Sequence, residues 1–254
     1  MGGDLSRRRD EIGDLGRHFD GMAARLEQSI AAQRQLLHDV SHELRSPLAR
    51  IEVAAELAKN RPDRAPEALA RIERESGRLD QLIEEVLTLA RVEGGAVDSL
   101  DGYVDLVELL RVICEDAAFE ANAAGVAITL VPPSCEEIVV RGNGELLHRA
   151  IENVVRNALK HGGDADRVEL GVEELPEEGL VRVLVRDQGA GVSPEEIKGL
   201  FVPFARRPGS TGFGLGLSIA RRAVEAHGGA IRAGNHPEGG LEVQIDLPST
   251  ANAR

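Results

Sequence analysis

Mostly apolar residues recur at alternating steps of three and four along the first third of the chain. Steps of three and four place side chains along one face of a helix and are typical of coiled coils and helix bundles. The stretch KNRPDRAPEA interrupts the pattern, because its Pro62 and Pro66 break a helix. The sequence therefore predicts a helical hairpin between Leu26 and about Arg91. The positions on the two predicted stripes are Ile30, Gln33, Leu37, Val40, Leu44, Pro47, Ile51, Ala54 and Ala58, then Leu69, Ile72, Ser76, Leu79, Ile83, Val86 and Ala90.

A hairpin of this kind buries only one stripe on each helix. A second copy of the hairpin would supply the missing half of the core, so a homodimeric four-helix bundle is the expected arrangement. A monomeric hairpin that packs on the following domain is the alternative that the pattern leaves open.

The pattern changes after the stretch VEGGAVDSLDGY, which ends the second helix and is typical of a linker. Short runs of strand type (VAITLV, EIVV, RVELGV, LVRVLV, AIRAG and LEVQIDL) are then separated by helical stretches around 105–124, 144–161 and 215–228. Strands and helices mixed in this way indicate one α/β domain. The alternation of apolar and polar residues in VRVLVRD and LEVQIDL predicts a sheet with one solvent-exposed face.

The predicted fold class is α+β multidomain, a helical-hairpin dimerisation domain followed by an α/β sandwich. We assign residues 30–97 to the hairpin and residues 98–254 to the sandwich. The preceding segment, residues 1–29, is charged and half-amphipathic, which is typical of the end of a longer module cut at Met1. A naturally frayed terminus is the alternative.

Composition and charge exclude several classes of protein. Aromatic residues make up only 2% of the chain, so the core must be aliphatic. The formal net charge of −13 argues against nonspecific nucleic-acid binding, which requires clustered Lys and Arg. Cys114 and Cys135 lack metal-type spacing and are expected to be reduced thiols. No apolar run approaches the roughly 18 residues that span a bilayer, and no signal peptide is visible, so we expect this chain to be soluble and cytosolic.

Two histidines, His38 and His42, lie four residues apart in LLHDVSHELRSPL, and each is followed by a carboxylate. The heptad turns both side chains away from the seam, which disfavours a role in the core. A metal site is geometrically possible, but it needs a third ligand, and no other His or Cys follows at a suitable spacing. A nucleophile is favoured, because a neutral imidazole attacks phosphorus well when a carboxylate such as Glu43 accepts the proton of its other ring nitrogen.

Pro47 follows His42 by little more than one helical turn. Its ring removes a backbone hydrogen bond and clashes with the carbonyl of Glu43. We therefore expect the helix to bend here and to leave room for a bulky partner beside the imidazole. A packing kink without function is the alternative.

The stretch ENVVRNALKHG is the first of three candidate nucleotide motifs in the second domain. It places Asn153 and Asn157 one turn apart on one helix face. Amide oxygens at this spacing can hold Mg²⁺ without bringing negative charge next to phosphates. Lys160 and His161 follow one turn later, where they could reach those phosphates.

The other two motifs are rich in glycine. In VRDQGAGVS, Asp187 ends a strand and is placed to accept a hydrogen bond from an exocyclic amine such as that of adenine, while Gly189 and Gly191 let the backbone approach the ring. In TGFGLGLSIARR, glycines run into a helix whose backbone N–H groups could hold phosphates. The ending of a Walker loop is missing, so a different nucleotide fold is expected. These glycines are Gly212, Gly214 and Gly216.

The stretches SHELRSPL, ENVVRNALKH, DQGAG, LFVPF and GFGLGL resemble the H, N, G1, F and G2 boxes of bacterial sensor histidine kinases. They occur in the family's order and approximate spacing over residues 30–248. QLLHDVSHELRSPLARIEVA looks most like the Cpx-type envelope-stress sensors. DEIGDLGRHFDGMAARL resembles the second half of a HAMP signalling module, which normally follows a transmembrane helix. The resemblance therefore implies the cytoplasmic portion of an inner-membrane protein, anchored through a segment that precedes this chain.

The resemblance also implies roles for individual residues. His42 matches the phosphoacceptor and Glu43 its acid/base partner, while Asn157 matches the stronger Mg²⁺ ligand. Phe201 and Phe204 match the aromatic residues that anchor a mobile lid. In the short lid ARRPGST, an arginine could contact the γ-phosphate or dock near the phosphoacceptor. The other residues implied around Mg-ATP are Asn153, Lys160, His161, Asp187, Gly189, Gly191, Arg206 or Arg207, Gly212, Gly214, Leu215 and Gly216.

Two departures from the family pattern bear on function. The family often has Thr where Ser46 stands, a position tied to dephosphorylation of the response regulator, and serine keeps the hydroxyl. Related ATPases that hydrolyse ATP carry Glu where Asn153 stands, and an amide cannot activate water as a base. The site is therefore expected to spare ATP until His42 arrives.

The function that the resemblance implies is a homodimeric, Mg²⁺- and ATP-dependent protein-histidine kinase. Its phosphoryl group would pass from His42 to an aspartate of a response regulator receiver domain. A dimeric scaffold with a degenerate nucleotide domain and an ATP hydrolase of the wider superfamily are the rival hypotheses. Transfer within one subunit or between subunits stays open, since it depends on the handedness of the hairpin turn.

Overall fold

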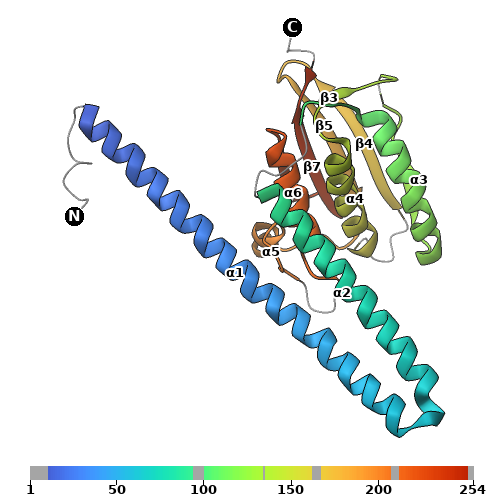
Figure 1. Cartoon of the computed structure of the whole chain (residues 1–254). Coiled ribbons are helices and arrows are strands. Elements are labelled where there is room, and N and C mark those ends of the chain that lie inside the picture. Colours follow the sequence, from blue (N-terminus) through green and yellow to red (C-terminus); the bar gives the residue numbers. More distant parts are fainter. Residues whose placement is uncertain (1–10, 94–99, 134, 162–166, 207–211, 251–254) are drawn as a thin grey trace. The chain divides into compact units, whose positions relative to one another are not determined.

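A computed structural model describes residues 11–93, 100–133, 135–161, 167–206 and 212–250 (Figure 1). Internal contacts divide the chain into two compact units, Met1–Asp80 and Gln81–Arg254. The division falls within the second long helix, so the last turns of this helix belong to the second unit. Residues 94–99, the middle of the predicted linker at 92–103, lie outside the described residues, as does Arg207.

The first unit is the predicted helical hairpin. Helix α1 (Glu11–Asn60) is followed by a single 3₁₀ turn (Pro62–Arg64) and by helix α2 (Ala65–Glu93). Pro66 lies in the first turn of α2, where the helix does not use the backbone N–H that proline lacks. Helix α1 runs through Pro47 as one element, and this proline is buried.

The predicted stripe on α2 is buried only in part within the single chain, where Ile72, Leu79 and Val86 are half-buried. The buried side chains recur every seven positions, whereas Leu69 and Ile83 on the predicted stripe are 54% and 48% exposed. Both rows have a helical period, so the spacing alone cannot tell which row faces the neighbouring helix. One row of α2 is therefore buried, while a second apolar stripe of the same helix is exposed. The buried row is Ala68, Glu75, Leu82 and Leu89.

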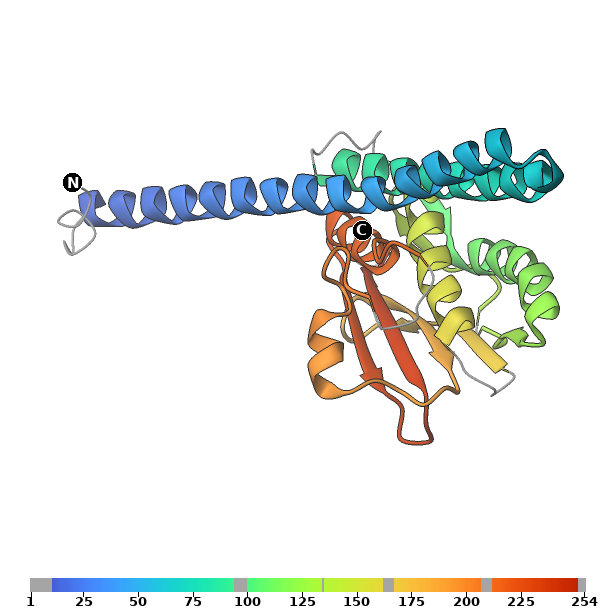
Figure 2. The same cartoon turned by 90° about the horizontal axis from the view of Figure 1, so that it is seen from below.

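The second unit is an α/β layer structure. Helices α3 (Leu106–Ala124), α4 (Gly144–His161) and α6 (Gly216–Ala226) cover one face of a five-stranded sheet (Figures 1 and 2). The strand order is β2-β4-β5-β7-β6, with β2 parallel to β4 and the other neighbours antiparallel. The strands of this sheet are β2 (Ala127–Leu130), β4 (Arg167–Leu175), β5 (Leu180–Asp187), β6 (Ala230–Asn235) and β7 (Leu241–Pro248).

All six predicted strand runs form strands, and the three predicted helices are present. The run EIVV contributes β3 (Val139–Arg141), which pairs with β1 (Tyr103–Asp105) in a separate two-stranded sheet. The sequence pattern did not predict β1 or the short helix α5 (Pro194–Gly199). Elements of three and six residues are too short to show a hydrophobic period.

The core of this unit is aliphatic, as the composition predicts. Alternate residues of the central strands point toward the helices and are buried, for example Val183 on β5 and Ile245 on β7. Helix α4 meets them with one continuous apolar face. The buried residues of that face are Leu146, Leu147, Ala150, Ile151, Val154, Val155 and Ala158.

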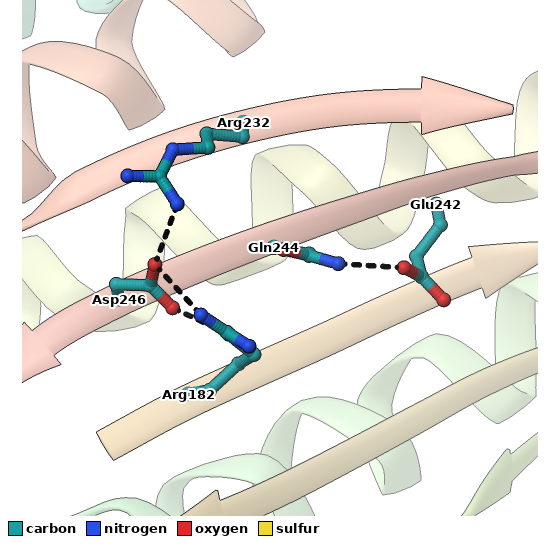
Figure 3. Close-up of polar contacts among 5 residues, drawn as sticks. All are labelled: Arg182, Arg232, Glu242, Gln244 and Asp246. Carbon is teal, nitrogen blue, oxygen red and sulfur yellow. Dashed lines mark hydrogen bonds and ion pairs between the residues drawn. The ribbon is translucent and has the colours of Figure 1, made fainter. Parts of the chain in front are cut away.

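The opposite face of the sheet is polar, which confirms the predicted alternation. Asp246 on β7 accepts hydrogen bonds from Arg182 on β5 at 2.6 and 3.1 Å, and it lies 3.5 Å from a guanidinium nitrogen of Arg232 on β6 (Figure 3). Beside this group, Gln244 donates a hydrogen bond to Glu242 at 2.8 Å. The hydrogen bond that Arg182 donates to Asp246 raises the pKa of Arg182. These ion pairs cover Asp246, which is only 3% exposed although it lies on the polar face.

Two further expectations concern thiols and membranes. Cys114, half-buried, and Cys135, exposed, are both free of disulfides. Burial raises the pKa of the Cys114 thiol. Within the described part of the chain, no helix combines the length and hydrophobicity that crossing a membrane requires.

Candidate functional site

Helix α4, which carries the predicted N-box residues, begins at a well-defined cap. The side-chain oxygen of Asn143 accepts a hydrogen bond from the backbone N–H of Leu146 at 3.0 Å, as an N-cap residue does. The backbone N–H of Asn143 donates to Nε2 of His227 at 3.0 Å, and Nδ1 of His227 lies 2.7 Å from the carbonyl oxygen of Ala223. Burial lowers the pKa of His227, which favours the neutral ring that accepts this bond. The start of α4 is therefore tied to the end of α6.

A cavity of about 420 Å³ opens beside the polar face of α4, within the second unit. It brings together residues from three motifs that are far apart in the sequence. Gly189, Phe204 and Leu215, which the resemblance also implied, are not among the lining residues. The implied residues that line the cavity are Asn153, Asn157, Lys160, His161, Asp187, Gly191, Arg206, Gly212, Gly214 and Gly216.

Asp187 ends β5 at the wall of the cavity and is 3% exposed. Its Oδ1 accepts hydrogen bonds from the backbone N–H groups of Gly189, at 2.9 Å, and of Leu241, at 3.0 Å. Both bonds use the same oxygen, so Oδ2 remains available to a ligand. A carboxylate oxygen held in this way can accept a hydrogen bond from an amine in the cavity.

Asn235, which the sequence reasoning missed, holds the loop after Asp187. Its side chain accepts a hydrogen bond from the backbone N–H of Val192 at 2.9 Å and donates to the carbonyl of the same residue at 2.7 Å. Gly191 has a φ of +74°, and a Cβ there would lie 2.8 Å from the Asn235 side-chain oxygen. Glycine is therefore required both for the backbone conformation and for the close approach.

The third motif packs closely against α4 and against the F-box segment. A Cβ on Gly216 would lie 3.2 Å from the side-chain oxygen of Asn153. A Cβ on Gly214 would lie 2.5 Å from the carbonyl of Ala205, and the Gly214 carbonyl accepts a bond from the N–H of Phe204 at 3.0 Å. Phe204 has a φ of +61°, a strained conformation for a bulky residue. Phe204 is not among the residues that line the cavity.

The turn that precedes β7 offers a prediction about stability. Gly240 has a φ of +84°, and a Cβ there would lie 1.8 Å from the carbonyl oxygen of Asp187. We expect Gly240→Ala to lower the free energy of unfolding by about 3 kcal/mol or more, because the strand ends that hold Asp187 must separate. Urea denaturation followed by circular dichroism measures this change.

The neighbouring Gly239 is a matched control. Its φ is +103°, but a Cβ there would meet no atom within 4 Å. Gly239→Ala should therefore show only the backbone strain, about 1 kcal/mol. Equal losses in the two variants would contradict the role of the close contact with Asp187.

The donor set beside the cavity fits a magnesium nucleotide. Asn153 and Asn157 present neutral amide oxygens one helical turn apart, and such hard oxygen donors suit Mg²⁺ when phosphates supply the negative charge. Lys160 adds a cation on the same face and lies 3.7 Å from the position of a Cβ on Gly212. Among the described residues, no group of three or more His, Cys, Asp or Glu side chains could hold a metal ion.

The candidate phosphoacceptor lies in the first unit, on α1. His42 is exposed, as the heptad predicts. The ring of His38 is also exposed and meets the ring of His42 edge-on, with 4.6 Å between ring centroids. Glu43 is half-buried, and the Ser46 hydroxyl accepts a hydrogen bond from Arg50 at 2.6 Å.

The sequence reasoning missed two sets of acidic and polar residues on α2. Glu75 was overlooked because the predicted stripe passed through Ser76, although the seven-residue repeat of the buried row would have located it. Gln81 and Glu85, at the start of the second unit, line the cavity, and Gln81 donates a hydrogen bond to Glu85 at 3.0 Å. Burial raises the pKa of Glu85, while the hydrogen bond from Gln81 and the nearby charge of Lys160 partly offset this effect.

Two family descriptions match the chain. Residues 32–95 match the His Kinase A (phospho-acceptor) domain, and residues 142–251 match the histidine kinase-, DNA gyrase B- and HSP90-like ATPase domain. The first match contains His42 and the second contains every predicted nucleotide motif.

Curated relatives match almost the whole length of this chain. The chain is 36% identical over 239 residues to the sensor histidine kinase CpxA of Escherichia coli K12, which covers 92% of this chain and 50% of CpxA. It is 35% identical over 248 residues to the sensor protein kinase PmrB of Pseudomonas aeruginosa, covering 94% of this chain and 50% of PmrB. The chain therefore spans about half the length of these relatives.

Solved structures show the same fold. The Acinetobacter baumannii histidine kinase AdeS superposes with a TM-score of 0.66 at 18% identity, covering 82% of this chain and 98% of that one. Full-length ShkA in complex with AMPPNP superposes with a TM-score of 0.64 at 28% identity, covering 85% of this chain and 46% of that one. Together, the two domain matches and these relatives show that the chain belongs to the sensor histidine kinases.

Proposed function

We propose that this chain is the catalytic portion of a sensor kinase that transfers the γ-phosphoryl group of ATP to His42 and then to an aspartate of a response regulator. The observation that carries the proposal is the cavity in which α4, the Asp187 loop and the glycine motif converge. These groups offer what a magnesium nucleotide requires, namely an acceptor for an amine, neutral oxygens for the metal and cations for the phosphates. An exposed histidine next to a carboxylate is the nucleophile that such a site needs.

In the nucleotide site, Oδ2 of Asp187 would accept a hydrogen bond from the exocyclic amine of adenine. Lys160 and Arg206 would contact the phosphates, and the amide oxygens of Asn157 and Asn153 would hold Mg²⁺. When bound there, Mg²⁺ would neutralise charge on the phosphates. His161 and the glycines of the third motif would shape the walls around them. The AMPPNP in the ShkA complex supports the assignment of a nucleotide to this domain.

The transfer step follows from the chemistry of the imidazole. One ring nitrogen of His42 forms a bond to the γ-phosphorus, and the bond from that phosphorus to the β–γ bridging oxygen breaks with its electron pair leaving on ADP. Glu43 takes the proton from the other ring nitrogen, which keeps the attacking nitrogen electron-rich. Most of the rate enhancement in such transfers comes from positioning and charge neutralisation.

The hairpin also supports the proposal of a homodimer. Leu69 and Ile83 form part of an apolar stripe that one hairpin leaves exposed, and Leu37 on α1 is exposed as well. A second hairpin would cover these residues in a four-helix bundle. We assign residues 30–97 to this dimerisation and phosphotransfer domain and residues 98–254 to the ATP-binding domain.

The resemblance of residues 10–26 to a HAMP module supports a place on the cytoplasmic side of the inner membrane. A membrane-spanning segment of the native protein would then carry the signal into α1. Nucleic acid is not a proposed partner, since the net charge is −13. Ser46 supports a second, opposing activity, the dephosphorylation of the same response regulator.

Incubation of the purified chain with γ-labelled ATP and Mg²⁺ tests the proposed function. We expect one acid-labile, alkali-stable phosphate on His42, and its loss from the chain when a receiver domain is added. Nucleotide binding without label on the chain would instead support a scaffold. Steady release of phosphate without phosphorylation of His42 would support an ATP hydrolase.

A mixture of two inactive variants tests the dimer. His42→Ala retains the nucleotide site, and Asn157→Ala retains the phosphoacceptor. Label on the Asn157→Ala chain in the mixture shows both dimerisation and transfer between subunits, whereas transfer within each subunit leaves both chains unlabelled.

A further inference from the structure

Glu75 is a carboxylate in the buried row of α2, where its neighbours along the row are alanine and leucine. It is only 6% exposed. A buried charge is costly unless it is paired, and Glu75 is paired with Arg50 of α1, at 2.9 Å, and with Arg78, at 3.6 Å. The hydrogen bond from Arg50 is the main cause that lowers the pKa of Glu75, so this group stays ionised near neutral pH.

Arg50 also contacts the motif around the phosphoacceptor. While one guanidinium nitrogen donates to Glu75, the other donates to the Ser46 hydroxyl oxygen at 2.6 Å. The Nε atom of Arg50 is buried and has no partner within the described part of the chain. Ser46, Arg50 and Glu75 thus form a line of hydrogen bonds from the exposed face of α1 to the buried row of α2.

A second serine on the same helix makes a different hydrogen bond. Ser41 donates its hydroxyl proton to the carbonyl of Leu37 at 2.8 Å, the common behaviour of serine within a helix. The Ser46 oxygen instead accepts a hydrogen bond from a cation. One lone pair of this oxygen is therefore occupied and its orientation is set, while the second lone pair can accept a bond from water.

We propose that Arg50, held in place by Glu75, is a positioning residue that orients the Ser46 hydroxyl for dephosphorylation of the response regulator. The proposal rests on the proposed function, in which Ser46 acts in this reaction. In the proposed step, a water molecule donates a hydrogen bond to the Ser46 oxygen. The oxygen of this water forms a bond to the phosphorus of the aspartyl phosphate. The bond from phosphorus to the aspartate oxygen breaks with its electron pair on the carboxylate, and the water proton leaves with the inorganic phosphate.

Stability alone does not explain why this ion pair lies inside an aliphatic hairpin. Apolar residues of similar size often replace a buried ion pair without loss of stability. Placing Glu75 on α2 has a further consequence, because a shift of α2 along α1 would separate the carboxylate from Arg50. The orientation of Ser46, and with it the rate of dephosphorylation, would then depend on the packing of the hairpin.

The main test replaces both members of the pair, since Arg50→Met alone would leave the buried Glu75 with only its more distant partner, Arg78. In Arg50→Met/Glu75→Leu, the hairpin keeps an apolar contact at this position. The probe is an isolated receiver domain that the wild-type kinase has labelled on its aspartate and that is then freed of kinase and nucleotide. We expect the double variant to release phosphate from this probe at least tenfold more slowly, with autophosphorylation of His42 within twofold of the wild-type rate.

Three further variants separate positioning from structure. Arg61→Met/Asp63→Leu removes an exposed ion pair of the same unit, 3.3 Å between partners, and should leave dephosphorylation unchanged. Arg50→Lys keeps a donor and should recover part of the rate. In the background of Ser46→Ala, the double variant should slow dephosphorylation by less than a further twofold, because Arg50 acts through Ser46.

The outcomes distinguish this proposal from the proposed function. A double variant that slows autophosphorylation and dephosphorylation equally would show a structural role and overturn the proposal, as would a full tenfold loss in the Ser46→Ala background. If Ser46→Ala itself dephosphorylates the probe at the wild-type rate, the proposed phosphatase role of Ser46 fails and takes the role of Arg50 with it. Autophosphorylation of His42 is measured separately and would still stand.

Discussion

Replacement of His42 by alanine is expected to reduce phosphorylation of the chain by about 10³-fold or more, because the variant lacks the nucleophile that accepts the phosphoryl group. The nucleotide site lies on other elements and should be unaffected. The measurement is the initial rate of labelling with γ-labelled ATP, together with the affinity for ATP in the same preparation. ATP affinity should stay within twofold of wild type.

His38→Ala is the matched control for this variant. His38 lies one turn earlier on the same helix, is also exposed, and its ring centroid is 4.6 Å from that of His42. Ser46 and Pro47 follow His42 by about one helical turn and are farther from His38. We therefore expect the loss of the His38 imidazole to change the rate of labelling by less than about tenfold. Equal loss of labelling in the two variants would contradict the assignment of His42 as the phosphoacceptor.

The second large effect is expected for Asp187→Asn, which should weaken ATP binding by about 10- to 100-fold. In the variant, the amide oxygen can still accept the bonds from Gly189 and Leu241, so the fold should be kept. The amide NH₂ group then replaces Oδ2 and meets the amine of adenine donor to donor. Calorimetric titration with ATP measures the affinity, and thermal unfolding measures the stability.

Asp246→Asn is the control for burial and charge. Asp246 is also 3% exposed, but it lies on the opposite face of the sheet, bonded to Arg182 (Figure 3). Its replacement weakens an ion pair with a largely buried arginine and should lower the free energy of unfolding by about 1–3 kcal/mol, with ATP affinity unchanged. If Asp246→Asn weakened ATP binding as much as Asp187→Asn, the loss in the latter would reflect destabilisation and not recognition of the amine.

The elements of this fold follow largely from local sequence. The steps of three and four between apolar residues, the two prolines of the turn and the alternation in the strands depend on side chains that are close in the chain. For the same reason the residue types of the nucleotide motifs were recognisable, since an acceptor for an amine, a pair of amides and a row of glycines each have a distinct chemistry. The cavity brings most of these residues together.

Long-range packing determined the features that the sequence reasoning missed. Asn235 is distant from Val192 in the sequence, and only the sheet places it where it holds both backbone groups of that residue. Glu75 lies beside a predicted position, yet whether it or Ser76 is buried depends on which face of α2 meets α1. A periodic pattern defines stripes on a helix but carries no information about the neighbour that each stripe meets.

The sequence by itself thus determined the helical hairpin, the α/β domain and the chemistry of the motifs, because these depend on local periodicity and on residue type. The tertiary structure alone decided which stripe of α2 is buried, that Gly240 must pass against the carbonyl of Asp187, and that Arg50 joins Ser46 to Glu75. Each of these depends on distances between residues that are far apart in the chain, and such distances are set only when the elements pack.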